Sequence, residues 1–200
     1  MSIDLNMQSP LAHMQALLEA KAVLAPDRFL LQELPFREWV NLRAGSGLDK
    51  VNGILQDNFN LELPLLPNTV VSSESHAIWW LGPDEWLLQS IQETGRPTLA
   101  LTLQAGLENV FARALDVSSG YTLLHLSGSE VAGVLNKGCP LDLDASVFAV
   151  GQCAHSHFFK ADIALRPVSD GWHVLLRRSF AGYAVQMLLD AAHDCYLDAD

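Results

Sequence analysis

Three side chains that commonly bind metal ions recur at every second position near residue 155. Cys153, His155 and His157 would share one face of a β-strand, because side chains two residues apart in a strand point to the same side. Thiolate and imidazole groups are typical zinc ligands. The next residues on that face are apolar, and a fourth ligand is missing unless His125 or Cys139 comes close. The pattern therefore favours a buried or rim strand face over a metal site.

Other residues that could do chemistry lack the partners that the chemistry needs. Asp142 and Asp144 share a loop that gives paired carboxylates no defined separation for acid–base work. Ser118 and Ser119 lie outside any G-x-S-x-G nucleophile motif. Cys139 would be reactive only if a neighbouring base lowered its pKa. We therefore predict no catalytic residue, no cofactor-binding residue and no metal ligand on this chain.

Three further groups of residues have structural interpretations, and for two of them an interface with a partner is the alternative. The Gly-Ser-Gly at residues 45–47 lacks the rest of a phosphate-loop or dinucleotide motif, so we interpret it as a turn. The Arg-Arg-Ser at residues 177–179 could pair with a carboxylate on its own surface or on a partner subunit. The aromatic cluster of Trp79, Trp80 and Trp86 favours a core, with an interface as the alternative.

Composition excludes several functional classes. The chain has 200 residues, 50% of them hydrophobic and 18% charged, which is enough for a sizeable core. The net charge is −11 and only 12 residues are Lys or Arg, so binding to nucleic acid or to an anionic membrane surface is disfavoured. The mean hydropathy of +0.17 suggests apolar surface that is buried against a partner.

Cysteine usage and the N-terminal residues point to the cytoplasm. The three cysteines, Cys139, Cys153 and Cys195, are an odd number without close pairing, which argues against a disulfide framework. The first eight residues carry no signal-peptide pattern, and no apolar run reaches the roughly 18 residues of a membrane span. We expect a cytoplasmic protein.

The order of elements predicts an α+β fold made of two similar β-α-β-β-α units with antiparallel or mixed sheets. Leu42 precedes Leu126 by nearly the same interval as Trp86 precedes Trp172, and each pair lies in matching strand-like stretches. The expected parts are an N-terminal arm at residues 1–28, a first unit at 29–114 and a second unit at 115–200.

Local patterns predict the elements within these parts. Ser9 and Pro10 begin a helix with Leu11, Met14, Leu17 and Leu18 on one face, which packs either on its own domain or on another subunit. The first unit is expected to contain strands at 29–34, 36–42, 77–81 and 86–91 and helices at 48–56 and 97–114. The second is expected to contain strands at 121–126, 152–165 and 172–177 and helices at 129–136 and 180–192, before an acidic tail at 194–200.

Motifs spread along nearly the whole chain resemble the gamma subunit of heterotetrameric sarcosine oxidase. The most specific are Leu-Gly-Pro-Asp-Glu-Trp-Leu-Leu at residues 81–88 and Lys-Gly-Cys-Pro-Leu-Asp-Leu at 137–143. Shorter matches carry the same resemblance: Ser-Pro-Leu-Ala-His at 9–13, Glu-Leu-Pro-Phe at 33–36, Asp-Val-Ser at 116–118 and Arg-Ser-Phe-Ala at 178–181. The segment at residues 152–160 departs from the family pattern.

The resemblance implies a role in one-carbon metabolism. The family's complex demethylates sarcosine to glycine, passes the one-carbon unit to tetrahydrofolate and produces hydrogen peroxide. The resemblance also implies that FAD, FMN, NAD and zinc are bound by the other subunits and that this chain binds no cofactor. It implies a fold similar to the folate-binding domain of aminomethyltransferases. The expected partners are the alpha subunit, which this chain would stabilise, and the beta and delta subunits. The alternative is a stand-alone folate-binding or one-carbon transfer domain, which rests on fold likeness alone.

Overall fold

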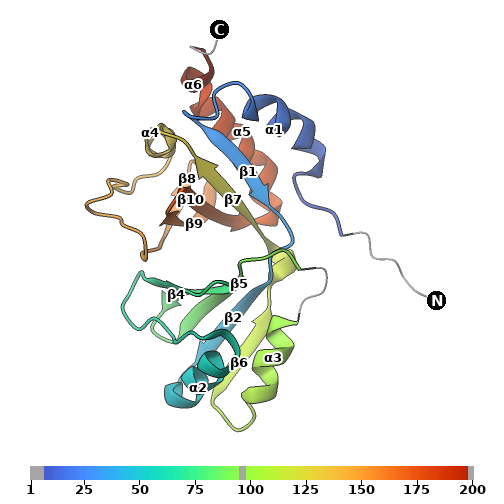
Figure 1. Ribbon diagram of the computed structural model, residues 1–200, viewed down its shortest axis with the longest axis vertical. Helices are drawn as coiled ribbons and strands as arrows, with labels where there is room; N and C mark the ends of the chain where they lie inside the picture. Colours follow the sequence, from blue (N-terminus) through green and yellow to red (C-terminus); the bar gives the residue numbers. More distant parts are fainter. Residues whose placement is uncertain (1–6, 95–97, 198–200) are drawn as a thin grey trace, which may run out of the picture.

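Two five-stranded antiparallel sheets lie at the centre of the molecule, and helices cover their outer faces (Figure 1). This computed structural model describes residues 7–94 and 98–197. Sheet A has the order β1 (Leu30–Leu34), β7 (Tyr121–Ser127), β10 (Gly171–Arg177), β9 (Ala161–Val168), β8 (Ala154–Phe158). Sheet B has the order β6 (Ala112–Asp116), β2 (Trp39–Ala44), β5 (Glu85–Ser90), β4 (His76–Gly82), β3 (Val70–Ser72). The α+β prediction is confirmed.

The helices divide between the two sheets. Sheet A is covered by α1 (Gln15–Ala22), α4 (Val131–Asn136) and α5 (Ala181–Ala191), with α6 (His193–Leu197) beyond them. Sheet B is covered by α2 (Leu48–Phe59) and α3 (Leu99–Gly106). Short 3-10 turns complete the chain: η1 (Ala12–Met14), η2 (Ser118–Gly120) and η3 (Arg178–Phe180). In the described ranges no helix has the length and apolar character needed to cross a membrane.

The strand register confirms the internal repeat. Leu42 of β2 pairs with Trp86 of β5, and Leu126 of β7 pairs with Trp172 of β10, so the matching residues of the two halves occupy matching positions. A further strand precedes the β-α-β-β-α elements of each repeat: β1, which matches the predicted strand at 29–34, and β6, which was not predicted. These strands, β1 and β6, each lie at the edge of the sheet that the other repeat builds. The boundaries at residues 29–114 and 115–200 stay a prediction.

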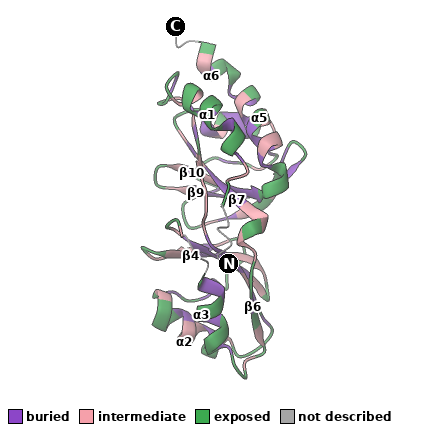
Figure 2. Cartoon of the chain, turned by 90° about the vertical axis from the view of Figure 1, so that its right-hand side faces the viewer, coloured by how far each residue is buried: buried purple, intermediate pink, exposed green. Residues whose placement is uncertain are grey.

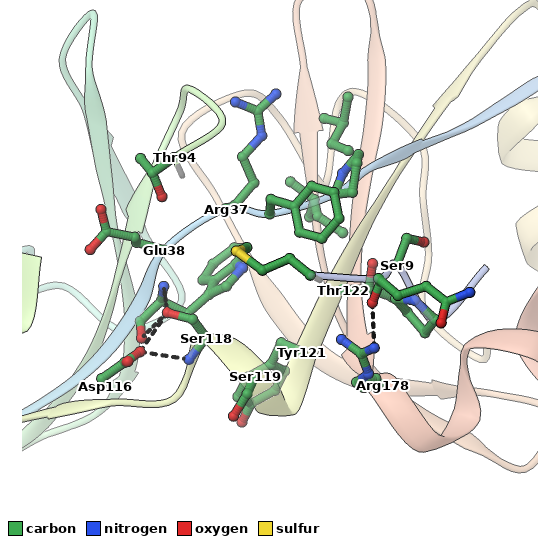
Figure 3. A pocket seen from close by; sticks show the side chains of 18 residues that line it. Ser9, Arg37, Glu38, Thr94, Asp116, Ser118, Ser119, Tyr121, Thr122 and Arg178 are labelled. Atoms are coloured by element: carbon green, nitrogen blue, oxygen red, sulfur yellow. Dashed lines mark hydrogen bonds between the residues drawn. The ribbon is translucent and has the colours of Figure 1, made fainter. Parts of the chain in front are cut away.

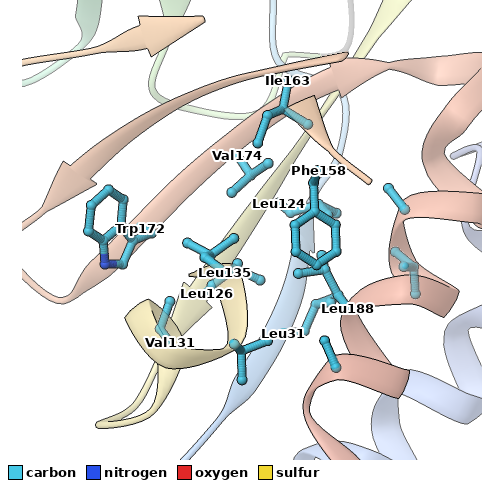
Figure 4. Close-up of a cluster of buried hydrophobic side chains, with 14 of the residues drawn as sticks. Leu31, Leu124, Leu126, Val131, Leu135, Phe158, Ile163, Trp172, Val174 and Leu188 are labelled. Carbon is cyan, nitrogen blue, oxygen red and sulfur yellow. The ribbon is translucent and has the colours of Figure 1, made fainter. Parts of the chain in front are cut away.

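Three apolar clusters hold the layers together. The largest lies between sheet A and its helices and contains the residues of Figure 4, among them Leu124, Phe158 and Leu188. A second fills the space between sheet B and its helices α2 and α3. The third lies between the sheets and joins residues of both: Trp39, Val70, Ala77, Trp79, Leu87, Leu123, Cys153, Ala164 and Leu175. Buried residues therefore run through the whole length of the molecule (Figure 2).

Two element predictions are wrong. The predicted helix at 97–114 is α3 followed by the edge strand β6, which pairs with β2 from Ala112 to Asp116. The predicted single strand at 152–165 is a hairpin of β8 and β9, with His155 opposite Ala164 and His157 opposite Asp162. In both cases pairing with a distant or returning strand decided the structure.

The N-terminal arm packs on its own chain. The Ser9 hydroxyl accepts a hydrogen bond from the Leu11 backbone N–H at 2.9 Å, but the helical elements begin later than predicted, with η1 at Ala12 and α1 at Gln15. Leu11, Met14 and Leu18 are buried in the sheet A core, whereas Leu17 is exposed. The final helix α6 occupies part of the predicted acidic tail, and residues 198–200 lie outside the described ranges.

Candidate functional site

The two segments that lead from one sheet to the other meet at the middle of the molecule. Residues 34–39 connect β1 to β2, and residues 116–121 connect β6 to β7. A cavity of about 410 Å³ lies against both segments and against residues 7–10 of the N-terminal arm (Figure 3). The strand exchange therefore creates a cavity where the two connecting segments meet the N-terminal arm.

Hydrogen bonds fix the sheet B side of this cavity. The Ser118 hydroxyl oxygen accepts from the Trp39 backbone N–H at 2.9 Å. The Ser118 hydroxyl and backbone N–H donate to the Asp116 carboxylate at 2.5 and 2.9 Å. The buried Glu38 carboxylate accepts from the backbone N–H groups of Thr98 and Leu99 at 2.6 and 2.7 Å, which caps the start of α3. Ser118 thus links the two segments that connect the sheets, residues 34–39 and 116–121, by hydrogen bonds.

A second polar group fixes the arm side. The Glu33 carboxylate accepts hydrogen bonds from the hydroxyls of Ser9 and Thr122, the latter at 2.6 Å. The Arg178 guanidinium donates to the backbone carbonyl of Gln8. These bonds tie the arm to β1, to β7 and to the start of η3. Arg178 thus contacts a carbonyl of its own chain, and pairing of these arginines with a partner subunit stays a prediction.

The remaining walls are aromatic and apolar. Phe36, Trp39 and Tyr121 line the cavity together with Met7. Phe36 has a φ of +54°, a left-handed conformation that is uncommon for a bulky residue and often marks a constrained site. Arg37 donates to the Ile91 carbonyl, while its Nε is buried and has no hydrogen-bond partner within the described residues. The aromatic and apolar walls of the cavity suit a largely apolar ligand.

A buried arginine lies between the two sheets. Arg166 of β9 is 7% exposed, and its guanidinium lies over the Trp79 ring of sheet B at 5.0 Å. It donates to Ser72 Oγ at 3.1 Å and contacts His173 Nδ1 at 3.4 Å. Burial lowers the Arg166 pKa to about 10. Its contacts with Trp79 and Ser72 make it a polar link between the sheets.

The imidazole of His173 is held neutral in this environment. Burial lowers its pKa to about 3, and the neighbouring Arg166 and His125 add to the effect, as does Arg37. Asp170 acts in the opposite direction, and its carboxylate lies 3.6 Å from His125 Nε2. The rings of His125 and His173 are 5.4 Å apart in an edge-to-face arrangement. At mildly acidic pH, His173 therefore binds a proton in the unfolded chain but stays neutral in the folded one.

This cost predicts a loss of stability in acid. The unfolded histidine binds its proton with a pKa near 6.5, and the folded one only at about 3. Because the unfolded state then holds more protons between these values, the free energy of unfolding falls as pH drops through this window. His173 alone should contribute a loss of about 2 kcal/mol between pH 7 and pH 5. Urea denaturation of the native chain and of His173→Gln would measure it; equal pH slopes for the two would contradict the assignment.

The metal-ligand candidates do not form a site. Within the described residues no group of three His, Cys, Asp or Glu side chains is placed to hold a metal ion. Cys153 is buried between the sheets, and burial raises its pKa to about 11, which disfavours the thiolate form. His155 and His157 lie on the edge strand β8. The three residues do follow the predicted alternation, but their face turns toward sheet B.

The other candidates have structural roles. Asp142 and Asp144 each accept a hydrogen bond from a backbone N–H two residues ahead, at 3.0 and 2.9 Å, and so shape their own loop. Cys139 is buried, with its Sγ 3.5 Å from Ser156 Oγ. Arg177 lies over the Tyr121 ring at 4.4 Å. These contacts lie within one chain.

The tryptophan cluster splits between two layers. Trp79 is buried between the sheets and donates from Nε1 to Gln89 Oε1 at 3.0 Å. Trp86 is buried on the opposite face of sheet B, and Trp80 packs against that same core. The core reading is therefore confirmed for Trp79 and Trp86. The turn reading of residues 45–47 also holds, because this stretch joins β2 to α2.

Sequence reasoning missed Arg37, Glu38, Thr122, Arg166 and His173. A weak signal existed for Arg166, which is the one cation in an otherwise apolar stretch, Ile163 to Val168, and shares the inward face with Ala164. No local signal marks the others, because their roles arise from contacts between segments far apart in the sequence.

Comparison with solved structures first defines the class of fold. The aminomethyltransferase T of the glycine cleavage system from Bartonella henselae superposes with a TM-score of 0.64 at 12% identity, over 86% of this chain and 48% of that one. At this identity the likeness concerns the fold alone. The heterotetrameric sarcosine oxidase from Corynebacterium sp. U-96 contains a chain that superposes with a TM-score of 0.83 at 33% identity, over 95% of this chain and 96% of that one.

Sequence comparison identifies the family. The model of the sarcosine oxidase, gamma subunit family matches residues 46–194. Sarcosine oxidase subunit gamma of Corynebacterium sp. (strain U-96) is 33% identical over 92% of this chain and 89% of its own length. Its counterpart in Corynebacterium sp. (strain P-1) is 34% identical over 80% of this chain and 78% of its own length. The chain belongs to the sarcosine oxidase gamma subunit family.

Proposed function

We propose that this chain is the non-catalytic gamma subunit of a heterotetrameric sarcosine oxidase and that it stabilises the alpha subunit. The observation that carries the proposal is the superposition on a chain of the heterotetrameric enzyme over nearly the full length of both. The geometry agrees, because Glu38, Asp116 and Ser118 at the central cavity are engaged in holding the crossing segments. Sarcosine oxidation would then take place on other subunits, which would carry FAD, FMN, NAD and zinc.

A cytoplasmic location belongs to the same proposal. Cys139, Cys153 and Cys195 are all free thiols and all buried, which fits a reducing compartment. The acidic balance of the chain, with a net charge of −11, gives no support for a nucleic-acid or anionic-membrane partner.

Co-expression with the alpha subunit tests the proposal. We expect the two chains to co-elute in a fixed ratio on size-exclusion chromatography, and the alpha subunit to have a lower thermal midpoint when it is made alone. A specific permanent interface usually buries roughly 2,000 Å² or more, so the two subunits should stay associated during chromatography. A monomeric chain that leaves the elution and the stability of alpha unchanged would overturn the proposal.

A second candidate function is binding of a folate-type ligand by the chain itself. The central cavity favours it, because aromatic side chains wall a space of about 410 Å³. Tetrahydrofolate titrated into the isolated chain should then give saturable binding by calorimetry, weakened at least tenfold in Tyr121→Ala. Absence of binding up to 1 mM, roughly the weak limit of specific ligands, would dispose of this candidate.

A further inference from the structure

The two loops that lead from the first helix of each repeat to its next strand meet at their C-terminal ends. Residues 61–69 connect α2 to β3, and residues 140–151 lie in the connection from α4 to β8 (Figure 1). We refer to them as the paired loops. The Val70 N–H donates to the Gly151 carbonyl at 2.8 Å, and the Cys153 N–H donates to the Asn68 carbonyl at 2.9 Å. These bonds join the two repeats at one edge of the molecule.

Each of the paired loops is anchored in its own core. In the first loop Leu61 and Leu63 are buried, and the Trp86 Nε1 donates to the Pro64 carbonyl at 2.9 Å. In the second loop Leu143 and Phe148 are buried, and the Phe148 ring meets the Trp172 ring edge to face at 5.4 Å. The matching tryptophans of the repeat thus support matching loops. Both loops hold their shape before any partner arrives, which lowers the entropic cost of binding.

Each loop also directs two apolar side chains outward. Leu65 and Leu66 are 62% and 69% exposed, and Val147 and Val150 are 57% and 67% exposed. Single exposed apolar residues are ordinary, but four on two hydrogen-bonded loops indicate a surface that is covered in the assembled protein.

The charges around the paired loops have one sign. Neither loop contains Lys or Arg, and none occurs anywhere in residues 51–95 or 138–159. The loops do carry the exposed carboxylates of Glu62, Asp142 and Asp144. Exposed apolar side chains on loops that carry carboxylates and no cations are complementary to an apolar surface that Lys or Arg side chains surround.

We propose that the paired loops form a docking surface for another subunit of the complex, whose contacting face is apolar with a basic rim. The inference rests on the proposed function, since that function supplies the partner. Leu66 and Val150, the most exposed apolar residue of each loop, would enter the partner's apolar centre, and the carboxylates of the loops would face its cations.

The test compares two double variants of the full chain. The loop variant carries Leu66→Ser and Val150→Ser. The control variant carries Val23→Ser, just after α1, and Leu101→Ser, in α3, which alter apolar residues of similar exposure. Each chain is added to the remaining subunits after these are co-expressed without it, and the dissociation constant is measured. We expect at least a tenfold increase for the loop variant and less than a threefold change for the control. Circular dichroism with thermal melting checks that each variant is folded.

A charge variant gives an independent readout. Glu62→Lys should weaken binding several-fold at low salt, and the effect should shrink as salt screens the charges. If the loop variant fails to fold, Glu62→Lys alone tests whether the paired loops contact the partner. Equal affinities of native chain, loop variant and Glu62→Lys would overturn the docking surface and leave the proposed function intact. If the native chain itself does not bind the other subunits, the proposed function fails, and the docking surface with it.

Discussion

Replacing Trp79 by alanine should remove about 4 kcal/mol from the free energy of unfolding. The side chain is fully buried between the sheets, and its ring meets the Trp39 ring edge to face at 6.0 Å. Large-to-small changes of a buried tryptophan typically cost 3–5 kcal/mol, about half of the stability of an ordinary domain. The change also removes the aromatic face under the buried Arg166 cation and the donor to Gln89. Urea denaturation followed by far-ultraviolet circular dichroism measures the loss.

Trp79→Phe separates the parts of this effect. Phenylalanine keeps an aromatic ring under Arg166 but cannot donate to Gln89, so the expected loss is about 1–2 kcal/mol. Because the cluster between the sheets joins both repeats, the two sheets should unfold in one transition in the native chain and in Trp79→Phe. A loss below about 1 kcal/mol for Trp79→Ala would mean that the layer between the sheets contributes little to stability.

Local patterns were sufficient for the repeat and for most helices. Leu42, Trp86, Leu126 and Trp172 mark matching strands because alternation and spacing are encoded in the sequence itself. The edge strand β1 was expected at residues 29–34, but the edge strand β6 was not predictable in this way. Residues 112–116 extend because they pair with β2, and a helical pattern read from neighbouring residues cannot reveal such a partner.

The turn between β8 and β9 was hidden for a different reason. Phe159 occupies a left-handed conformation, with φ at +50°. Glycine or asparagine is usual at such a position and would have predicted the turn. Phe159 N–H donates to the Gly138 carbonyl at 2.9 Å, and its ring packs against Phe158. Tertiary contacts therefore impose a turn that the residue type disfavours, and the sequence reads as one long strand.

The central cavity was beyond prediction because no single segment builds it. Its walls come from residues 7–10, 34–39 and 116–123, which meet only because the first strand of each repeat joins the opposite sheet. The β1 sequence alone does not name its partner, and only the pairing with β7 places Leu31 in the sheet A core. The motif resemblance indicated the duplicated fold, but the exchange of strands appears only in three dimensions.

Gly171→Ala should destabilise the chain by about 3 kcal/mol, because two separate penalties fall on this position. Its φ of +148° is one that side-chain-bearing residues rarely adopt, at a cost of roughly 1–3 kcal/mol. An added Cβ would also lie 2.1 Å from the Leu126 carbonyl oxygen. That carbonyl cannot retreat easily, since β7 is paired with β1 on one side and β10 on the other.

Two other glycines separate these penalties in the same denaturation experiment. Gly151→Ala meets no atom within 4 Å but shares a positive φ of +95°, so its loss measures backbone strain alone. Gly53→Ala, inside α2 with equally open space, should stabilise the chain by about 0.5–1 kcal/mol because alanine favours the helix. The excess loss in Gly171→Ala over Gly151→Ala is then the collision with β7. Equal losses at the two positions would mean that the sheet yields there, and the tight approach of the β9–β10 turn to Leu126 would not be a constraint on the fold.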